Sequence, residues 1–178
     1  MYIPIILGTG RKGRQSEKVA NYIKEQVLKT DVKTEILDVR DYRLIATDNT
    51  GEPEVAIQWK EKIVKANGLI IVSPEYNHGY PGELKMALDM IYSEYKGKPV
   101  GICAVSGGGL GGARVVENLL PVLIALGMVP LQNAMYFSNV QDLFDEQGAI
   151  KDASYDDRFV KFFDELLLYT KAPKTTKE

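Results

Sequence analysis

The chain has 178 residues, a formal net charge of −2 at pH 7 and a hydrophobic content of 45%. This length suits one domain with a substantial core, and the near-neutral charge gives no electrostatic basis for binding nucleic acid. One cysteine and one histidine exclude an intrachain disulfide framework and argue against a zinc site built from these residue types. Because there is neither a signal-peptide pattern nor an apolar run that could span a bilayer, we expect a cytoplasmic protein that does not bind membranes.

Apolar runs alternate with segments of helical periodicity, which is the pattern of a parallel sheet covered by helices on both faces. The strands are predicted at about residues 4–7, 33–38, 69–72, 100–105 and 128–137. The helices are predicted at about residues 16–29, 54–66, 82–93, 112–126 and 155–169.

Some segments depart from this regular alternation. Pro121 lies inside the fourth predicted helix, where its ring should kink or restart the helix. Residues 140–152 are acidic and rich in turn formers, so we predict a solvated loop there. We expect one domain over residues 1–170 and a disordered tail at 171–178.

Three predicted strands lead into loops of unusual composition, at residues 8–16, 73–82 and 106–112. In an open parallel sheet, ligands bind beyond the carboxyl ends of the strands, where the strand order reverses. With the strand order 2-1-3-4-5, the first, third and fourth strands are neighbours. The three loops would then meet at one crevice.

The first loop begins with Gly-Thr-Gly-Arg-Lys-Gly at residues 8–13, and this glycine spacing after a strand is typical of a dinucleotide-binding turn. Three cations at the turn, Arg11, Lys12 and Arg14, favour a different ligand. A phosphate monoester carries about −1.5 to −2 charges and is stabilised by added cations, whereas the diester of a dinucleotide needs only helix N–H groups.

Other groups in this loop also suit a phosphate. Thr9 and Ser16 carry hydroxyls, Arg11 is a planar bidentate donor, and the following helix begins with free N–H groups. The alternative is a plain turn in which Ser16 caps the helix and the basic residues are exposed.

The second loop, at residues 73–82, contains two prolines, two tyrosines, an asparagine and a histidine. It combines a stiff backbone with flat apolar faces and hydrogen-bond donors, which is what a flavin ring requires. Taken singly, His78 also fits a loop residue with a local partner, and Glu75 fits a surface charge or a backbone cap.

The third loop, at residues 106–112, has five glycines in seven residues. Glycines cost backbone entropy on folding, so a close approach of the backbone to a ligand explains them better than a simple turn. A flexible linker is the alternative. Cys103, in the preceding strand, is expected to be a core residue rather than a nucleophile.

With these loops the chain resembles the NAD(P)H-dependent FMN reductase family of flavodoxin-like proteins, which includes quinone, azo-dye and chromate reductases. The likeness covers about residues 3–170. It rests first on the second loop, with Pro-Glu-Tyr-Asn at 74–77, Gly79, Pro-Gly at 81–82 and Leu-Lys at 84–85. The third loop adds Ser-Gly-Gly at 106–108 with residues 111–114. The first loop adds Gly-Thr-Gly-Arg at 8–11. Arg14 stands where many members have serine, so Ser16 is taken as the residue that provides the hydroxyl for the phosphate instead.

The resemblance implies a flavodoxin-like three-layer α/β sandwich, with a five-stranded parallel sheet of order 2-1-3-4-5, that binds FMN. The phosphate would be held by Thr9, Arg11, Gln15 and Ser16. The flavin ring would be lined by Pro74, Glu75, Tyr76, Asn77 and His78, and on its pyrimidine side by Ser106, Gly107, Gly108 and Gly109. The resemblance also implies a homodimer or homotetramer with a shared substrate cleft.

The predicted function is that of an FMN-dependent NAD(P)H oxidoreductase. NAD(P)H would pass a hydride to N5 of bound FMN, and a small oxidant such as a quinone, a flavin or an azo compound would then take the electrons. No side chain need act as acid or base, because the flavin carries the chemistry. As a further hypothesis, Lys12 or Arg14 recognises the 2′-phosphate of NADPH.

Alternatives from other classes remain open. One is a nicotinamide-binding dehydrogenase, for which Asp38 lies about where the required acidic residue should be. Another is a non-enzymatic electron carrier such as flavodoxin, although carriers of that kind are typically more acidic. A structural or regulatory flavin sensor is also compatible with the sequence.

Overall fold

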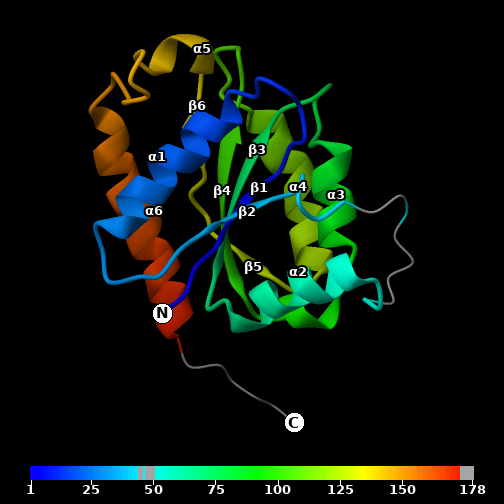
Figure 1. The fold of residues 1–178 in the computed structure, drawn as a ribbon. Helices are drawn as coiled ribbons and strands as arrows, with labels where there is room; N and C mark the ends of the chain where they lie inside the picture. Colours follow the sequence, from blue (N-terminus) through cyan, green and yellow to red (C-terminus); the bar gives the residue numbers. More distant parts are fainter. Residues whose placement is uncertain (44–45, 47–50, 173–178) are drawn as a thin grey trace.

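The computed structural model describes residues 1–43, 46 and 51–172. Within them the sheet has the strand order β2-β1-β3-β4-β5, with β6 also paired to β4 (Figure 1). All of these pairings are parallel. The strands are β1 (Ile5–Leu7), β2 (Ile36–Asp38), β3 (Leu69–Pro74), β4 (Pro99–Val105), β5 (Val129–Pro130) and β6 (Met135–Phe137). The predicted order 2-1-3-4-5 is therefore confirmed.

Helices cover both faces of the sheet, as Figure 1 shows. One face is covered by α1 (Ser16–Leu28) and α6 (Ser154–Lys171). The other is covered by α2 (Glu54–Lys65), α3 (Gly82–Leu88) and α4 (Ala113–Ala125). Two shorter elements complete the described chain, the 3-10 helix η1 (Ser93–Tyr95) and α5 (Val140–Leu143). None of the described helices is both long and apolar enough to cross a membrane.

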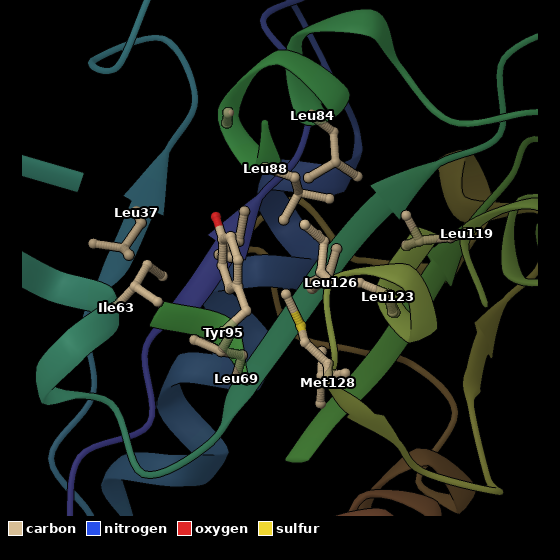
Figure 2. Packing of buried hydrophobic residues seen from close by; sticks show 14 of the residues in the cluster. Leu37, Ile63, Leu69, Leu84, Leu88, Tyr95, Leu119, Leu123, Leu126 and Met128 are labelled. Carbon is tan, nitrogen blue, oxygen red and sulfur yellow. The ribbon is translucent and has the colours of Figure 1, made fainter. Parts of the chain in front are cut away.

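The core on the α2–α3–α4 side is built around Tyr95. Its hydroxyl accepts a hydrogen bond of 2.7 Å from Nε1 of Trp59, and both side chains are fully buried. Figure 2 shows Tyr95 in the middle of the cluster, with Ile63 on one side and Met128 on the other. The bond satisfies the polar atoms of two large aromatic side chains, which would otherwise oppose their burial.

The last predicted strand, at 128–137, forms two short strands instead of one. β5 pairs with β4 only briefly, through the N–H groups of Val129 and Leu131, which donate to the Lys98 and Val100 carbonyls at 2.9 and 3.0 Å. The next residues then turn to α6, because Glu165 accepts hydrogen bonds from the Gln132 N–H at 2.9 Å and from Nδ2 of Asn133 at 2.8 Å. Pairing with β4 resumes only at Met135.

Other expectations also need correction. The third predicted helix ends at Leu88 rather than 93, because the chain turns there and brings Tyr95 into the core. Residues 140–152 are not a solvated loop throughout, since they begin with α5 and bury Val140 and Phe144. Helix α4 continues through Pro121 and does not restart. The predicted disordered tail begins too early, because Lys171 is the last residue of α6, and residues 173–178 lie outside the described residues.

Cys103 is a core residue, as expected. It lies within β4 and is fully buried, and burial raises the pKa of its thiol. A thiol that resists ionisation in this way is a poor nucleophile.

Gly101 on β4 provides a test of the packing between the sheet and α6. A Cβ at this position would lie 2.3 Å from Cζ of Phe162, which is 2% exposed. We expect Gly101→Ala to lower the free energy of unfolding by about 1–3 kcal/mol, measured by urea denaturation. Gly82→Ala is the control, because a Cβ there meets no atom within 4 Å. Equal stability of the two variants would contradict the packing described.

Candidate functional site

A cavity of about 320 Å³ opens at the carboxyl ends of the parallel strands, where open α/β sheets bind ligands. Figure 1 shows the loops after β1, β3 and β4 at this edge, close to α5. The cavity is lined by Arg11, Gly13, Arg14, Gln15, Ser16, Pro74, Glu75, Tyr76, Val105, Ser106, Gly107, Val140 and Gln141. The three loops therefore meet at one site, as their positions after neighbouring strands predict.

The cavity includes most, but not all, of the expected residues. Those that line it are Arg11, Gln15, Ser16, Pro74, Glu75, Tyr76, Ser106 and Gly107; those that do not are Thr9, Asn77, His78, Gly108 and Gly109. Arg14 was expected only as a cation of the first loop and Gly13 only as part of its turn, whereas Val105, Val140 and Gln141 were not predicted at the site. Val140 and Gln141 follow β6, so they also fit the rule that ligands bind beyond the carboxyl ends of strands.

Ser16 is the most informative residue of the lining. It is 1% exposed, and its Oγ is one of two buried side-chain oxygens without a hydrogen-bond partner in the described part of the chain. Gln15 rather than Ser16 occupies the N-cap position of α1, without a capping bond, so the interpretation of Ser16 as a cap is wrong. An unpaired buried hydroxyl costs free energy unless a ligand satisfies it.

The backbone at the start of α1 adds to this set of donors. No described residue accepts a hydrogen bond from the N–H of Gln15 or Ser16. A helix N-terminus carries a partial positive charge of roughly half a unit, and its free N–H groups bind anions. Gly13, with a φ of 64°, provides the left-handed turn that brings the loop into the helix.

Thr9 joins the first two loops instead of lining the cavity. It is fully buried, its Oγ1 lies 2.8 Å from the hydroxyl oxygen of Tyr76, and it accepts a hydrogen bond of 3.3 Å from the Arg11 N–H. Tyr76 lines the cavity, so this contact fixes a wall of the site.

Asn77 and His78 form the corner of the second loop. Tyr76 and Gly79 exchange two backbone hydrogen bonds of 2.9 Å, and the two residues between them have φ values of 49° and 67°. Positive φ at both central residues defines the tight hairpin turn that suits twisted strands. The His78 carbonyl accepts a 2.8 Å hydrogen bond from Nδ2 of Asn118 on α4, which holds the corner in place.

Glu75 combines a place in the cavity wall with a structural contact. Its Oε2 accepts a hydrogen bond of 3.2 Å from the Arg114 N–H at the start of α4, and its Oε1 lies 3.6 Å from Nη1 of the same residue. The carboxylate thus satisfies an N–H of the first turn of α4. Glu75 is both a wall residue and a backbone cap.

The glycines of the third loop have two different roles. Gly111 and Gly112 have φ values of 60° and 87°, and a Cβ on Gly112 would lie 3.0 Å from that of Ala104. The path of the chain into α4 therefore requires these two glycines without any ligand. Gly107 lines the cavity, and its carbonyl accepts a hydrogen bond of 3.2 Å from Nε2 of Gln141.

A buried ion pair lies behind the first loop. The guanidinium of Arg14, 2% exposed, binds both carboxylate oxygens of Asp38, one of them at 2.8 Å from Nη1. Burial alone would raise the pKa of Asp38, but the hydrogen bonds from Arg14 and from the Arg40 N–H outweigh it and lower that pKa. The hydrogen bond to Asp38 raises the pKa of Arg14.

This pair corrects two expectations. The Arg14 guanidinium is buried and engaged, so the hypothesis that it recognises a 2′-phosphate is wrong, whereas Lys12 is exposed. Both oxygens of Asp38 are already bound, so this carboxylate is not free to bind a ribose. The feature that supported a nicotinamide-binding dehydrogenase therefore has a structural role.

We expect Asp38→Asn to lower the free energy of unfolding by about 3 kcal/mol at neutral pH. This is the low end for a broken buried pair, since the Asp38 side chain is 21% exposed. Because the pKa of Asp38 is lowered in the folded state, its contribution is complete above the unfolded-state pKa of about 3.9 and is lost as the pH falls through the folded-state value.

Urea denaturation of both proteins at neutral pH and at about pH 3 measures this difference. The gap between wild type and variant should shrink in acid. Asp41→Asn, which changes an exposed carboxylate nearby, is the control and should have little effect. A gap that is independent of pH would contradict the assignment.

The model of the NADPH-dependent FMN reductase family matches residues 1–142. An NAD(P)H-dependent FMN reductase of Schizosaccharomyces pombe is 36% identical over 127 residues, which are 66% of this chain and 62% of that protein. A 2-hydroxy-1,4-benzoquinone reductase of Burkholderia sp. is 32% identical over 83% of this chain and 84% of its own.

The fold also matches a solved structure along nearly its whole length. The flavoenzyme NAD(P)H:(acceptor) oxidoreductase FerB from Paracoccus denitrificans superposes with a TM-score of 0.78. The two sequences are 22% identical, and the match covers 95% of this chain and 96% of that one.

Proposed function

Because the chain belongs to the NADPH-dependent FMN reductase family, we propose that it binds FMN in the cavity at the carboxyl edge of the sheet and acts as an NAD(P)H oxidoreductase. The observation that carries the proposal is the unpartnered Oγ of Ser16 in the wall of this cavity. When bound, FMN supplies the chemistry, because its ring accepts a hydride from NAD(P)H and passes electrons to an oxidant.

The phosphate end of the site has the donors that a phosphate monoester needs. Ser16 offers a buried hydroxyl, Arg11 a guanidinium, and the start of α1 free N–H groups. Gln15 lies beside them in the lining. Thr9 supports this end from behind through Tyr76 and the Arg11 N–H, so its proposed role is indirect.

The remaining wall suits a flat ring with a polar edge. Pro74 and Tyr76 provide apolar surface, and Ser106 and Gly107 provide backbone groups close to the cavity. Glu75 and Gln141 are held by contacts with α4 and Gly107, so they are fixed before any ligand binds. These residues bind and orient the ring and exclude water, and none is proposed as an acid or base.

The electron acceptor is proposed to be a small quinone-like oxidant, like the benzoquinone for which the Burkholderia relative is named. Lys12, exposed next to Arg11, is the proposed contact for the 2′-phosphate of NADPH. A homodimer or homotetramer stays a prediction, supported by the exposed apolar side chains of Tyr92, Leu110 and Ile124 near α3 and α4. The cytoplasmic location also stays a prediction.

Anaerobic addition of NADPH to the FMN-loaded protein distinguishes an oxidoreductase from an electron carrier. We expect the visible absorption band of the oxidised flavin to disappear without any partner protein, and to return on addition of a benzoquinone. A flavin that binds but is not bleached by NADPH or NADH would favour the carrier. A protein that binds no FMN would contradict the proposal altogether.

Ser16→Ala tests the phosphate end directly. We expect FMN affinity, measured by quenching of flavin fluorescence, to fall about tenfold, whereas riboflavin, which lacks the phosphate, should bind as before. The ligand-free variant should be as stable as wild type or more so, because the substitution removes an unsatisfied polar group.

Thr34→Val is the matched control for this substitution. Oγ1 of Thr34 is the other buried side-chain oxygen without a partner in the described chain, and Thr34 does not line the cavity. Its replacement should leave FMN affinity unchanged. Loss of FMN affinity in both variants, or in neither, would refute the role given to Ser16.

A further inference from the structure

Three successive carbonyl groups of the first loop accept hydrogen bonds from arginine side chains. The Thr9 carbonyl binds Nη1 of Arg14. The Gly10 carbonyl accepts a hydrogen bond of 3.2 Å from Nε of Arg40, and the Arg11 carbonyl binds Nη2 of the same side chain. Two guanidiniums thus hold the oxygen side of the loop that precedes α1.

Both arginines are connected to Asp38 at the end of β2. Arg14 binds its two carboxylate oxygens through the side chain, and Arg40 donates its backbone N–H to Oδ1 at 3.0 Å. One carboxylate on the sheet therefore holds the side chain of Arg14 and the backbone from which the side chain of Arg40 extends.

Fixing these carbonyls also fixes the neighbouring N–H groups. In a trans peptide the C=O and N–H bonds point in opposite directions, so the N–H groups of Gly10, Arg11 and Lys12 are directed away from the guanidiniums. The N–H of Arg11 donates to Thr9 Oγ1, and no described residue accepts a hydrogen bond from the other two. A released carbonyl that turned toward the cavity would repel a phosphate.

The two arginines differ in how deeply their side chains are buried and in whether they form an ion pair. Arg14 is buried in the ion pair, whereas Arg40 is half-buried and has no ion-pair partner among the described residues. Arg40 does not line the cavity. Its contact with the loop therefore acts on a ligand only through the backbone of Gly10 and Arg11.

We propose that Arg40 is a positioning residue for phosphate recognition: by binding the Gly10 and Arg11 carbonyls it keeps the first loop in the conformation that selects a phosphorylated flavin. The inference rests on the proposed FMN site. It assigns discrimination between FMN and riboflavin to a side chain outside the cavity.

The test compares FMN and riboflavin binding to ligand-free Arg40→Ala by flavin fluorescence. FMN affinity should fall about tenfold, the factor for the loss of one hydrogen bond to a charged group, while riboflavin affinity stays within about twofold of wild type. Arg40→Lys keeps the charge but not the two-point contact, so it should restore only part of the loss. A general effect on folding would change both affinities together.

Lys12→Ala is the charge-matched control, because Lys12 is an exposed cation of the same loop. It should weaken FMN binding less than Arg40→Ala does. Equal losses in the two variants, full restoration by Arg40→Lys, or unchanged FMN binding by Arg40→Ala would each overturn the inference.

If Arg40→Ala does not fold, Arg40→Lys and Arg40→Gln decide the question. Each keeps one donor, so a selective loss of FMN affinity supports the inference and unchanged affinity overturns it. Wild-type protein that binds neither flavin would refute the proposed function itself, whereas wild type and variants that bind FMN equally well would refute only the role of Arg40.

Discussion

The carboxylate of Asp38 is the fixed point on which the arrangement of the site depends. It lies at the end of β2, and through Arg14 and Arg40 it holds the carbonyls of the loop after β1. Replacing a buried ion pair by apolar residues is often neutral or stabilising, so net stability alone does not account for this pair. What it adds is a single conformation for a glycine-rich loop that would otherwise have many.

The other walls are fixed by the same kind of contact between neighbouring loops. Tyr76 is bound to Thr9, Glu75 to the start of α4, and Gln141 to the carbonyl of Gly107. Tyr76 and Glu75 are thus tied to residues that do not line the cavity, whereas Gln141 is tied to a neighbouring residue of the lining. A site organised in this way loses little conformational entropy when a flat ligand binds.

The sequence was sufficient for the fold class and for the meeting of three loops at one cavity, because strand order and the loops after strands follow from the alternation of apolar and helical segments. It was not sufficient for the contacts that define the residues' roles. Asp38 and Arg14 are 24 residues apart, and no local pattern reveals their pairing. Serine is a common helix N-cap, and only the burial of its Oγ without a hydrogen-bond partner distinguishes Ser16 from a capping residue. Helix α5 is too short to show a period, so Gln141 was missed.

The unsatisfied hydroxyl of Ser16 also links the amount of this protein in a cell to the supply of its proposed ligand. A ligand that binds only the folded chain raises its stability by mass action, and the gain is larger where the empty site contains an unmade hydrogen bond. Chains that lack the ligand unfold more often and are the ones that proteases degrade. Scarcity of flavin would therefore reduce the number of molecules as well as their occupancy.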